Sequence, residues 1–226
     1  MPLDGLEALS SMTPIAPRLG GDRLRVLCLG AHSDDLEIGC GGTLLRWLRE
    51  YGSVELCWAV FGAQGERAVE ARRSADALLE RADYRVVLGD LPDARMHGEF
   101  ARAKEFAIGL RESFAPDVVL THRLEDRHQD HRLVAELTWQ VWRNQMILEY
   151  EIPKYEGDLG QPNVYVPIDE VDRSRKSAHL LEHFGSQRSK EWFSAETFDA
   201  LLRLRGIECR APSGYAEAFH ARKLVW

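Results

Sequence analysis

Short apolar runs and amphipathic stretches alternate along most of the chain. The runs have the length of buried strands, and the stretches repeat apolar residues at helical spacing, as Ala71, Ala75 and Leu78 do in residues 66–82. The pattern predicts strands at 24–29, 54–61, 84–88, 118–121, 146–150, 163–168 and 216–225, and helices at 42–52, 66–82, 100–114, 130–142, 169–184 and 194–205. Strands that alternate with helices predict an α/β fold with a mostly parallel sheet and helices on both faces.

The organisation of the chain favours one domain. Residues 1–23 are rich in Pro, Gly and Ser and are interpreted as a loose N-terminal arm. The chain contains no internal repeat, low-complexity tract or convincing linker, and 226 residues suit one substantial domain. We therefore expect residues 24–226 to form a single domain.

Composition and charge narrow the class of partner. The formal net charge of −7 argues against nucleic acid, whose binding depends on basic patches. No stretch approaches the roughly 20 apolar residues of a membrane span, and residues 1–23 lack the apolar core of a secretory signal. The four cysteines (Cys28, Cys40, Cys57 and Cys209) have no C-x-x-C spacing. We expect a cytoplasmic protein that acts on a small molecule.

Two clusters of His and Asp carry the candidate chemistry. His32-Ser33-Asp34-Asp35 follows the predicted strand 24–29, and His128-Gln129-Asp130-His131 follows the predicted strand 118–121. Ligands of open α/β sheets bind at the carboxyl ends of strands. His and Asp can hold a divalent metal and leave one position open for water. The two clusters are therefore interpreted as the two halves of one metal site.

The spacing within the clusters suggests separate roles. A loop can fold His32 and Asp35 toward one point, while Asp34 between them projects differently and can act as a general base. His131 as a third ligand gives His₂Asp, a set with the ligand number of a catalytic zinc site.

The remaining two residues of the second cluster suit supporting roles. His128 can face the same cavity and hydrogen-bond a substrate oxygen. Asp130 is well placed to cap the helix that begins there, to orient one of the imidazoles and to raise the pKa of His128.

Simpler interpretations compete with the metal site. An Asp-Asp pair is often a solvated turn, His131 can lie on the surface, and Glu125, Asp126 and Arg127 form a charged loop that needs no function. The occurrence of both clusters at strand ends favours the metal site. The glycines Gly39, Gly41 and Gly42 do not complete a dinucleotide-binding pattern, and we interpret them as allowing a tight turn between the metal loop and the next helix.

The motifs resemble those of the LmbE/PIG-L family of metal-dependent N-deacetylases. That family usually has A-H-P-D-D, then G-G-T, then H-P-D-H, where this chain has Ala31-His32-Ser33-Asp34-Asp35, Gly41-Gly42-Thr43 and His128-Gln129-Asp130-His131. The likeness covers most of the chain, although Ser33 and Gln129 replace prolines. It implies a Rossmann-like single domain that removes an N-acetyl group from an amino sugar or its conjugate, with zinc or ferrous iron as cofactor.

The resemblance also implies a role for each matching residue. By motif, His32, Asp35 and His131 are metal ligands and Asp34 is the general base. His128 stabilises the oxyanion and protonates the leaving amine, and Asp130 tunes a histidine. The weaker matches Arg73-x-x-Asp76 and Leu91-Pro92-Asp93 suggest that Arg73 and Asp93 contact the sugar.

Two other functions remain open from the sequence. An amidase that cleaves a larger acyl group or a thiol–sugar conjugate would share the metal site. A non-catalytic sugar-binding or metal-storage protein would need neither Asp34 nor His128. The substrate stays open among a glycoside, a sugar nucleotide and a glycolipid headgroup, and a homo-oligomer is compatible with the sequence.

Overall fold

A single seven-stranded sheet forms the centre of the protein. The computed structural model describes residues 23–224, so the predicted N-terminal arm lies outside the described residues except for Arg23. The strand order is β3-β2-β1-β4-β5-β7-β6. The strands are β1 (Arg23–Gly30), β2 (Ser53–Val60), β3 (Asp83–Leu88), β4 (Val118–Thr121), β5 (Met146–Tyr150), β6 (Val164–Pro167) and β7 (Ala216–His220).

The pairing of the strands places a crevice at the centre of the sheet. β1 pairs in parallel with β2 and β4, β2 with β3, and β4 with β5, whereas β7 is antiparallel to β5 and to β6. The predicted mostly parallel sheet is confirmed. The strand order reverses between β1 and β4, and loops that leave such a switch point diverge and open a crevice at the carboxyl ends of the strands.

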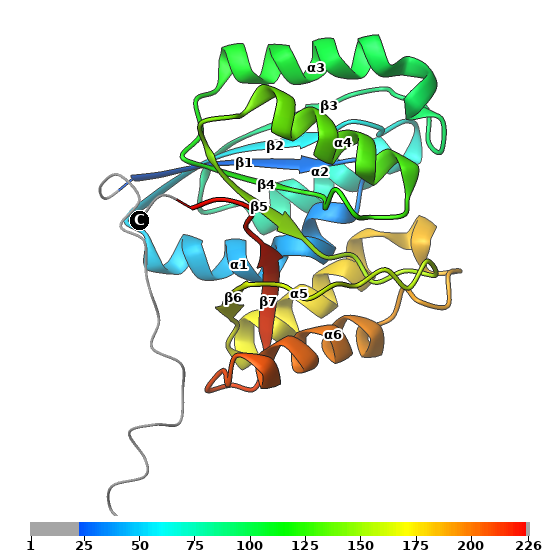
Figure 1. Ribbon diagram of the computed structural model, residues 1–226. Helices are drawn as coiled ribbons and strands as arrows, with labels where there is room; N and C mark the ends of the chain where they lie inside the picture. The colour runs from blue at the N-terminus through cyan, green and yellow to red at the C-terminus, as the bar shows by residue number, and fades with distance from the viewer. Residues whose placement is uncertain (1–22, 225–226) are drawn as a thin grey trace, which may run out of the picture.

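Helices cover both faces of the sheet, as predicted (Figure 1). The helices are α1 (Asp35–Glu50), α2 (Glu66–Leu78), α3 (Phe100–Ser113), α4 (Gln129–Val141), α5 (Glu170–His183) and α6 (Ala195–Glu208), with short 3₁₀ turns η2 (Met96–Glu99) and η3 (Gly185–Gln187). Apolar residues of α1, α2, α5 and α6 pack in one core cluster, and those of α3 and α4 in another. None of the helices within residues 23–224 has the length and apolar character needed to cross a membrane.

Helix α1 begins seven residues earlier than predicted, at Asp35 instead of Gly42. The interpretation of Gly39, Gly41 and Gly42 as a turn before the helix is wrong, because all three lie inside it. Close packing explains two of them: a Cβ at residue 39 would overlap the ring of Tyr150, and a Cβ at residue 42 would press on the carboxylate of Glu217. Glycine has a low helix propensity, but the packing against Tyr150 and Glu217 requires a residue without a side chain at positions 39 and 42.

Glu217 and Lys176 bind the backbone in the middle of α1. Glu217 accepts the amide protons of Gly42 and Thr43 at 2.8 and 2.6 Å, and Lys176 Nζ donates to the carbonyl of Ile38 at 2.6 Å. The two side chains also form an ion pair of 2.7 Å and are almost fully buried. This pair connects α1 to α5 and β7.

We expect Lys176→Met to lower the free energy of unfolding by about 3–5 kcal/mol, because it leaves the Glu217 carboxylate buried without its cation. Urea denaturation measures the change. Arg23→Met is the control, since it removes an ion pair to Glu55 whose side chains are 58% and 27% exposed, and such pairs contribute about 0–1 kcal/mol. Equal losses in the two variants would contradict the assignment of a buried, structural ion pair.

Candidate metal and active site

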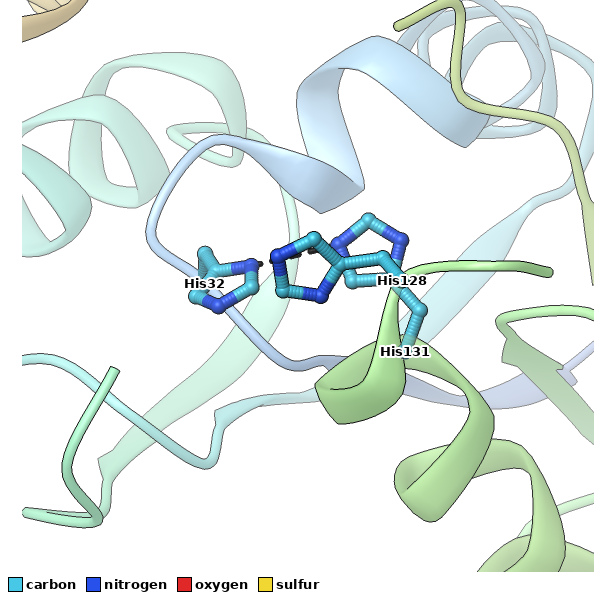
Figure 2. A group of neighbouring side chains, drawn as sticks. All are labelled: His32, His128 and His131. Atoms are coloured by element: carbon cyan, nitrogen blue, oxygen red, sulfur yellow. Dashed lines mark hydrogen bonds between the residues drawn. The ribbon is translucent and has the colours of Figure 1, made fainter. Parts of the chain in front are cut away.

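Two segments from neighbouring strands meet in the crevice between β1 and β4. The turn after β1 carries His32, Asp34 and Asp35, and the segment after β4 carries His128 and His131 at the start of α4. Figure 2 shows the three imidazoles gathered at the point where the turn before α1 faces the first turn of α4. The two predicted clusters therefore do come together.

Three predicted ligands offer atoms at the spacing of a coordination sphere. His32 Nδ1 lies 3.2 Å from His131 Nε2. The two oxygens of Asp35 face different histidines: Oδ1 lies 3.4 Å from His131 Nε2, and Oδ2 lies 3.6 Å from His32 Nδ1. Ligand atoms about 2.1 Å from a tetrahedral metal are about 3.4 Å apart. All three residues are buried, so the donor set fits a zinc or ferrous ion with one position left open.

His128 and His122 also lie within reach of this centre. Nitrogen atoms of His32, His128 and His131 lie within 4.8 Å of one another, and so do ligand atoms of Asp35, His122 and His131. The hydrogen bonding of His128 separates it from the ligands: its Nδ1 accepts the backbone proton of Asp130 at 3.3 Å. In a neutral ring the proton then resides on Nε2, which makes that atom a donor and not a ligand.

Asp130 contacts the imidazole of His32, whereas its predicted capping of the helix and its predicted effect on the pKa of His128 are not observed. Its carboxylate is fully buried, lies 3.3 Å from His32 Nε2, and accepts the backbone proton of Ala94 at 2.7 Å. The cap of α4 is His128, so the predicted capping by Asp130 is wrong. The expected rise in the pKa of His128 is also wrong: burial and the neighbouring His32 lower it, despite opposing carboxylates.

Asp126 is a site residue that sequence reasoning missed. Its carboxylate is 4% exposed and lies 3.0 Å from His131 Nδ1. The competing interpretation of residues 125–127 as a charged loop therefore does not describe Asp126, whose carboxylate is buried against a candidate ligand. Burial, together with the charge of His122, lowers the pKa of His131 to about 3, which keeps the imidazole neutral. The position of Asp126 just before the His/Asp cluster was the available signal.

His122 is a second residue that the sequence analysis missed. It follows β4 directly, and its ring stacks on that of His131 with 3.9 Å between the ring centroids. Its Nε2 lies 3.0 Å from the Asp35 carboxylate. The same nitrogen lies 3.0 Å from the amide of Ala31. A histidine immediately after a strand that ends at the crevice carried the signal.

Asp34 has a buried carboxylate next to the candidate ligands. It occupies the N-cap of α1 without making a side-chain cap bond, and it is 6% exposed. Burial and the charge of Asp35 raise its pKa to about 6. Such a group can take and return a proton near neutral pH.

The two predicted sugar contacts lie in different surroundings. Asp93 reaches the site: it is 3.1 Å from His32 Nε2 and forms an ion pair of 2.6 Å with Arg67, at the start of α2. Arg73 is exposed on α2, and no hydrogen bond or ion pair among residues 23–224 joins it to the cluster. Arg67 is therefore the α2 arginine that contacts this edge of the site.

A family comparison identifies the type of protein. Residues 27–142 match the model of the PIG-L family, described as GlcNAc-PI de-N-acetylase. The chain belongs to the PIG-L family. The matched residues include both His/Asp clusters, and the family places the chain among hydrolytic N-deacetylases, as the sequence motifs implied.

Individual relatives agree with this family and show how widely its fold is used. An uncharacterized deacetylase of Escherichia coli (strain K12), YaiS, is 29% identical over 171 residues, which are 71% of this chain and 91% of the relative. The N,N′-diacetylchitobiose deacetylase of Pyrococcus horikoshii has a TM-score of 0.60 at 18% identity, covering 87% of this chain and 83% of its own. The 4-carboxy-2-hydroxymuconate hydratase GalB of Pseudomonas putida KT2440 has a TM-score of 0.68 at 16% identity, covering 90% and 98%. Since a hydratase shares the fold, the fold alone does not identify the reaction of this chain. The assignment as a deacetylase therefore depends on the family match.

Proposed function

We propose that this PIG-L family enzyme removes an N-acetyl group from an amino sugar or its conjugate, using zinc or ferrous iron. The observation that carries the proposal is the buried group formed by His32 Nδ1, His131 Nε2 and the two oxygens of the Asp35 carboxylate. The contacts between the three residues are 3.2–3.6 Å, and the buried carboxylate of Asp34 lies beside them. Under this proposal His32, Asp35 and His131 hold the metal. The cytoplasm is the proposed compartment, since all four cysteines are free and buried.

The protein's own residues divide the chemical work. A divalent ion held by His32, Asp35 and His131 would polarise the acetyl carbonyl and lower the pKa of the attacking water. Asp34 accepts the proton of that water and returns it to the leaving amine. The resemblance assigned the second step to His128, but burial and the neighbouring His32 lower the pKa of that imidazole, which disfavours a cationic acid there. His128, with Nδ1 occupied by a backbone proton, presents Nε2–H to the carbonyl oxygen as negative charge develops there. One such donor typically contributes about 2.7–4 kcal/mol to the transition state.

The amino-sugar part of the proposal rests on the family description and on the rim of the site. Asp93, with a side chain 49% exposed, and Arg67, 30% exposed, form a polar edge next to His32. A carboxylate can accept hydrogen bonds from sugar hydroxyls, and a guanidinium group can donate hydrogen bonds to them. We therefore propose Asp93 and Arg67 as sugar contacts, while a contact by Arg73 stays a prediction from the resemblance.

An acetate-release screen tests the function. N-acetylated monosaccharides, disaccharides, glycosides and sugar nucleotides are incubated with the enzyme in the presence of added zinc or iron, or of a chelator. We expect acetate release from at least one amino sugar, lost with chelator and restored by metal. A parallel series with longer acyl groups distinguishes the amidase alternative. Release of longer acyl groups alone would contradict the assignment as an N-acetyl hydrolase.

His128→Ala should retain the metal and lower kcat by about 10²–10³, because it removes a donor to the developing oxyanion. Steady-state kinetics and metal analysis measure the two effects. His128→Gln is the matched variant, since its amide can donate from a similar distance and should recover part of the rate. Loss of the metal in His128→Ala would instead make His128 a ligand.

A further inference from the structure

The carboxylate of Asp126 connects the start of α4 to the candidate metal centre. Its Oδ1 accepts the backbone proton of His128 at 2.8 Å, and its Oδ2 lies 3.0 Å from His131 Nδ1. The same Oδ2 accepts from Lys154 Nζ at 2.9 Å. Both oxygens of the Asp126 carboxylate are therefore held in place by contacts with other residues.

This arrangement determines which nitrogen of His131 carries the proton. A carboxylate without a proton can only accept, so the contact at 3.0 Å requires a proton on His131 Nδ1. The proton is then absent from Nε2, the nitrogen that faces His32 Nδ1 and the Asp35 carboxylate. A carboxylate behind a ligating histidine typically fixes both its tautomer and its ring orientation.

Residues after β5 hold Asp126 in place. Lys154 has a side chain 7% exposed and bridges the carboxylates of Asp126 and Asp158, at 2.9 and 2.7 Å. Asp158 also accepts the backbone proton of Arg127 at 2.6 Å. Asp126 and Asp158 thus share Lys154, have side chains that are 4% and 6% exposed, and each accept one backbone proton, but of the two only Asp126 contacts His131.

We propose that Asp126 is a positioning residue that fixes His131 with Nε2 free for the metal, and that Lys154 anchors it for this purpose. The inference rests on the proposed metal site. The Asp126 carboxylate then has two effects: its contact with His131 raises the affinity for the metal, and its other contacts stabilise the fold. Asp126 acts only through His131 and touches no reacting atom.

Because Asp126 and Asp158 both pair with Lys154, Asp158 provides a matched control for a test at Asp126. The variants Asp126→Asn and Asp158→Asn are purified without metal. Competition with a chromogenic chelator measures the dissociation constant for zinc, and thermal unfolding measures the melting temperature of each variant. An amide at 126 cannot accept from both His131 and the His128 backbone, because one of its two ends is a donor. We expect Asp126→Asn to weaken zinc binding about 10- to 100-fold. Asp158→Asn should change it less than about threefold, although both variants lose stability.

The outcomes separate this inference from the proposed function. Equal zinc affinity in the two variants, with wild-type protein binding zinc through His131, would overturn the positioning role and leave the metal site standing. Wild-type protein that binds no zinc or iron would overturn the metal site itself, and the inference with it. If either asparagine variant does not fold, Asp126→Glu and Asp158→Glu repeat the comparison with the charge retained and the carboxylate displaced.

Discussion

His32→Ala and His131→Ala should each abolish stoichiometric metal binding and, with it, hydrolysis of the acetylated substrate. Each substitution removes one of three ligand residues whose donor groups make contacts of 3.2–3.6 Å, and a three-residue site loses its geometry with any one of them. Elemental analysis of the wild-type protein should give about one zinc or iron per chain. The variants should contain almost none.

A histidine outside the site controls for this result. His183 lies at the end of α5, with its ring tilted against that of His179, so His183→Ala removes an imidazole while the cluster stays intact. It should retain the metal content of the wild-type protein. Full metal content in His32→Ala and His131→Ala, at unchanged affinity, would remove both residues from the ligand set.

Asp34→Asn should lower kcat by about 10²–10⁴ while the protein keeps its metal and its fold. The substitution preserves size but removes the group proposed to take the proton of the attacking water. Metal is retained because Asp34 is not among the three ligands, and the fold is retained because its side chain makes no cap bond to α1. Steady-state kinetics, metal analysis and thermal unfolding measure the three properties.

Asp90→Asn is the control for that substitution. Asp90 pairs with Arg102 at the surface, where its side chain is 78% exposed, so activity should be unchanged. Near-wild-type activity in metal-loaded Asp34→Asn would assign the base to another group.

The sequence predicted the sheet and the meeting of the two clusters because both follow from short-range patterns. Apolar runs located β1 and β4, and the His/Asp motifs at their carboxyl ends then had to lie at one edge of a parallel sheet. The start of α1 was wrong for the opposite reason. Glycine weakens a helix locally, and the packing of Tyr150 against Gly39 that compensates for it involves a residue far along the chain.

The supporting residues of the site could not be assigned from spacing. Asp130 lies next to His131 in the sequence, yet its carboxylate bonds His32, which is 98 residues away. Asp126 precedes His131 by five residues and looked like part of a charged loop, but it is buried and pairs with Lys154. Which carboxylate serves which imidazole depends on side-chain directions that only the folded chain defines.

The division of the ligands between two distant segments links the metal to the integrity of the whole domain. His32 and His131 are 99 residues apart in sequence and meet only when β1 has paired with β4. An ion that binds this arrangement and not the unfolded chain adds its binding energy to folding, about 2.7 kcal/mol when the free ion is a hundredfold above its dissociation constant. The resistance of the protein to heat and proteolysis would then follow the concentration of free metal, so that metal starvation depletes the enzyme as well as inactivating it.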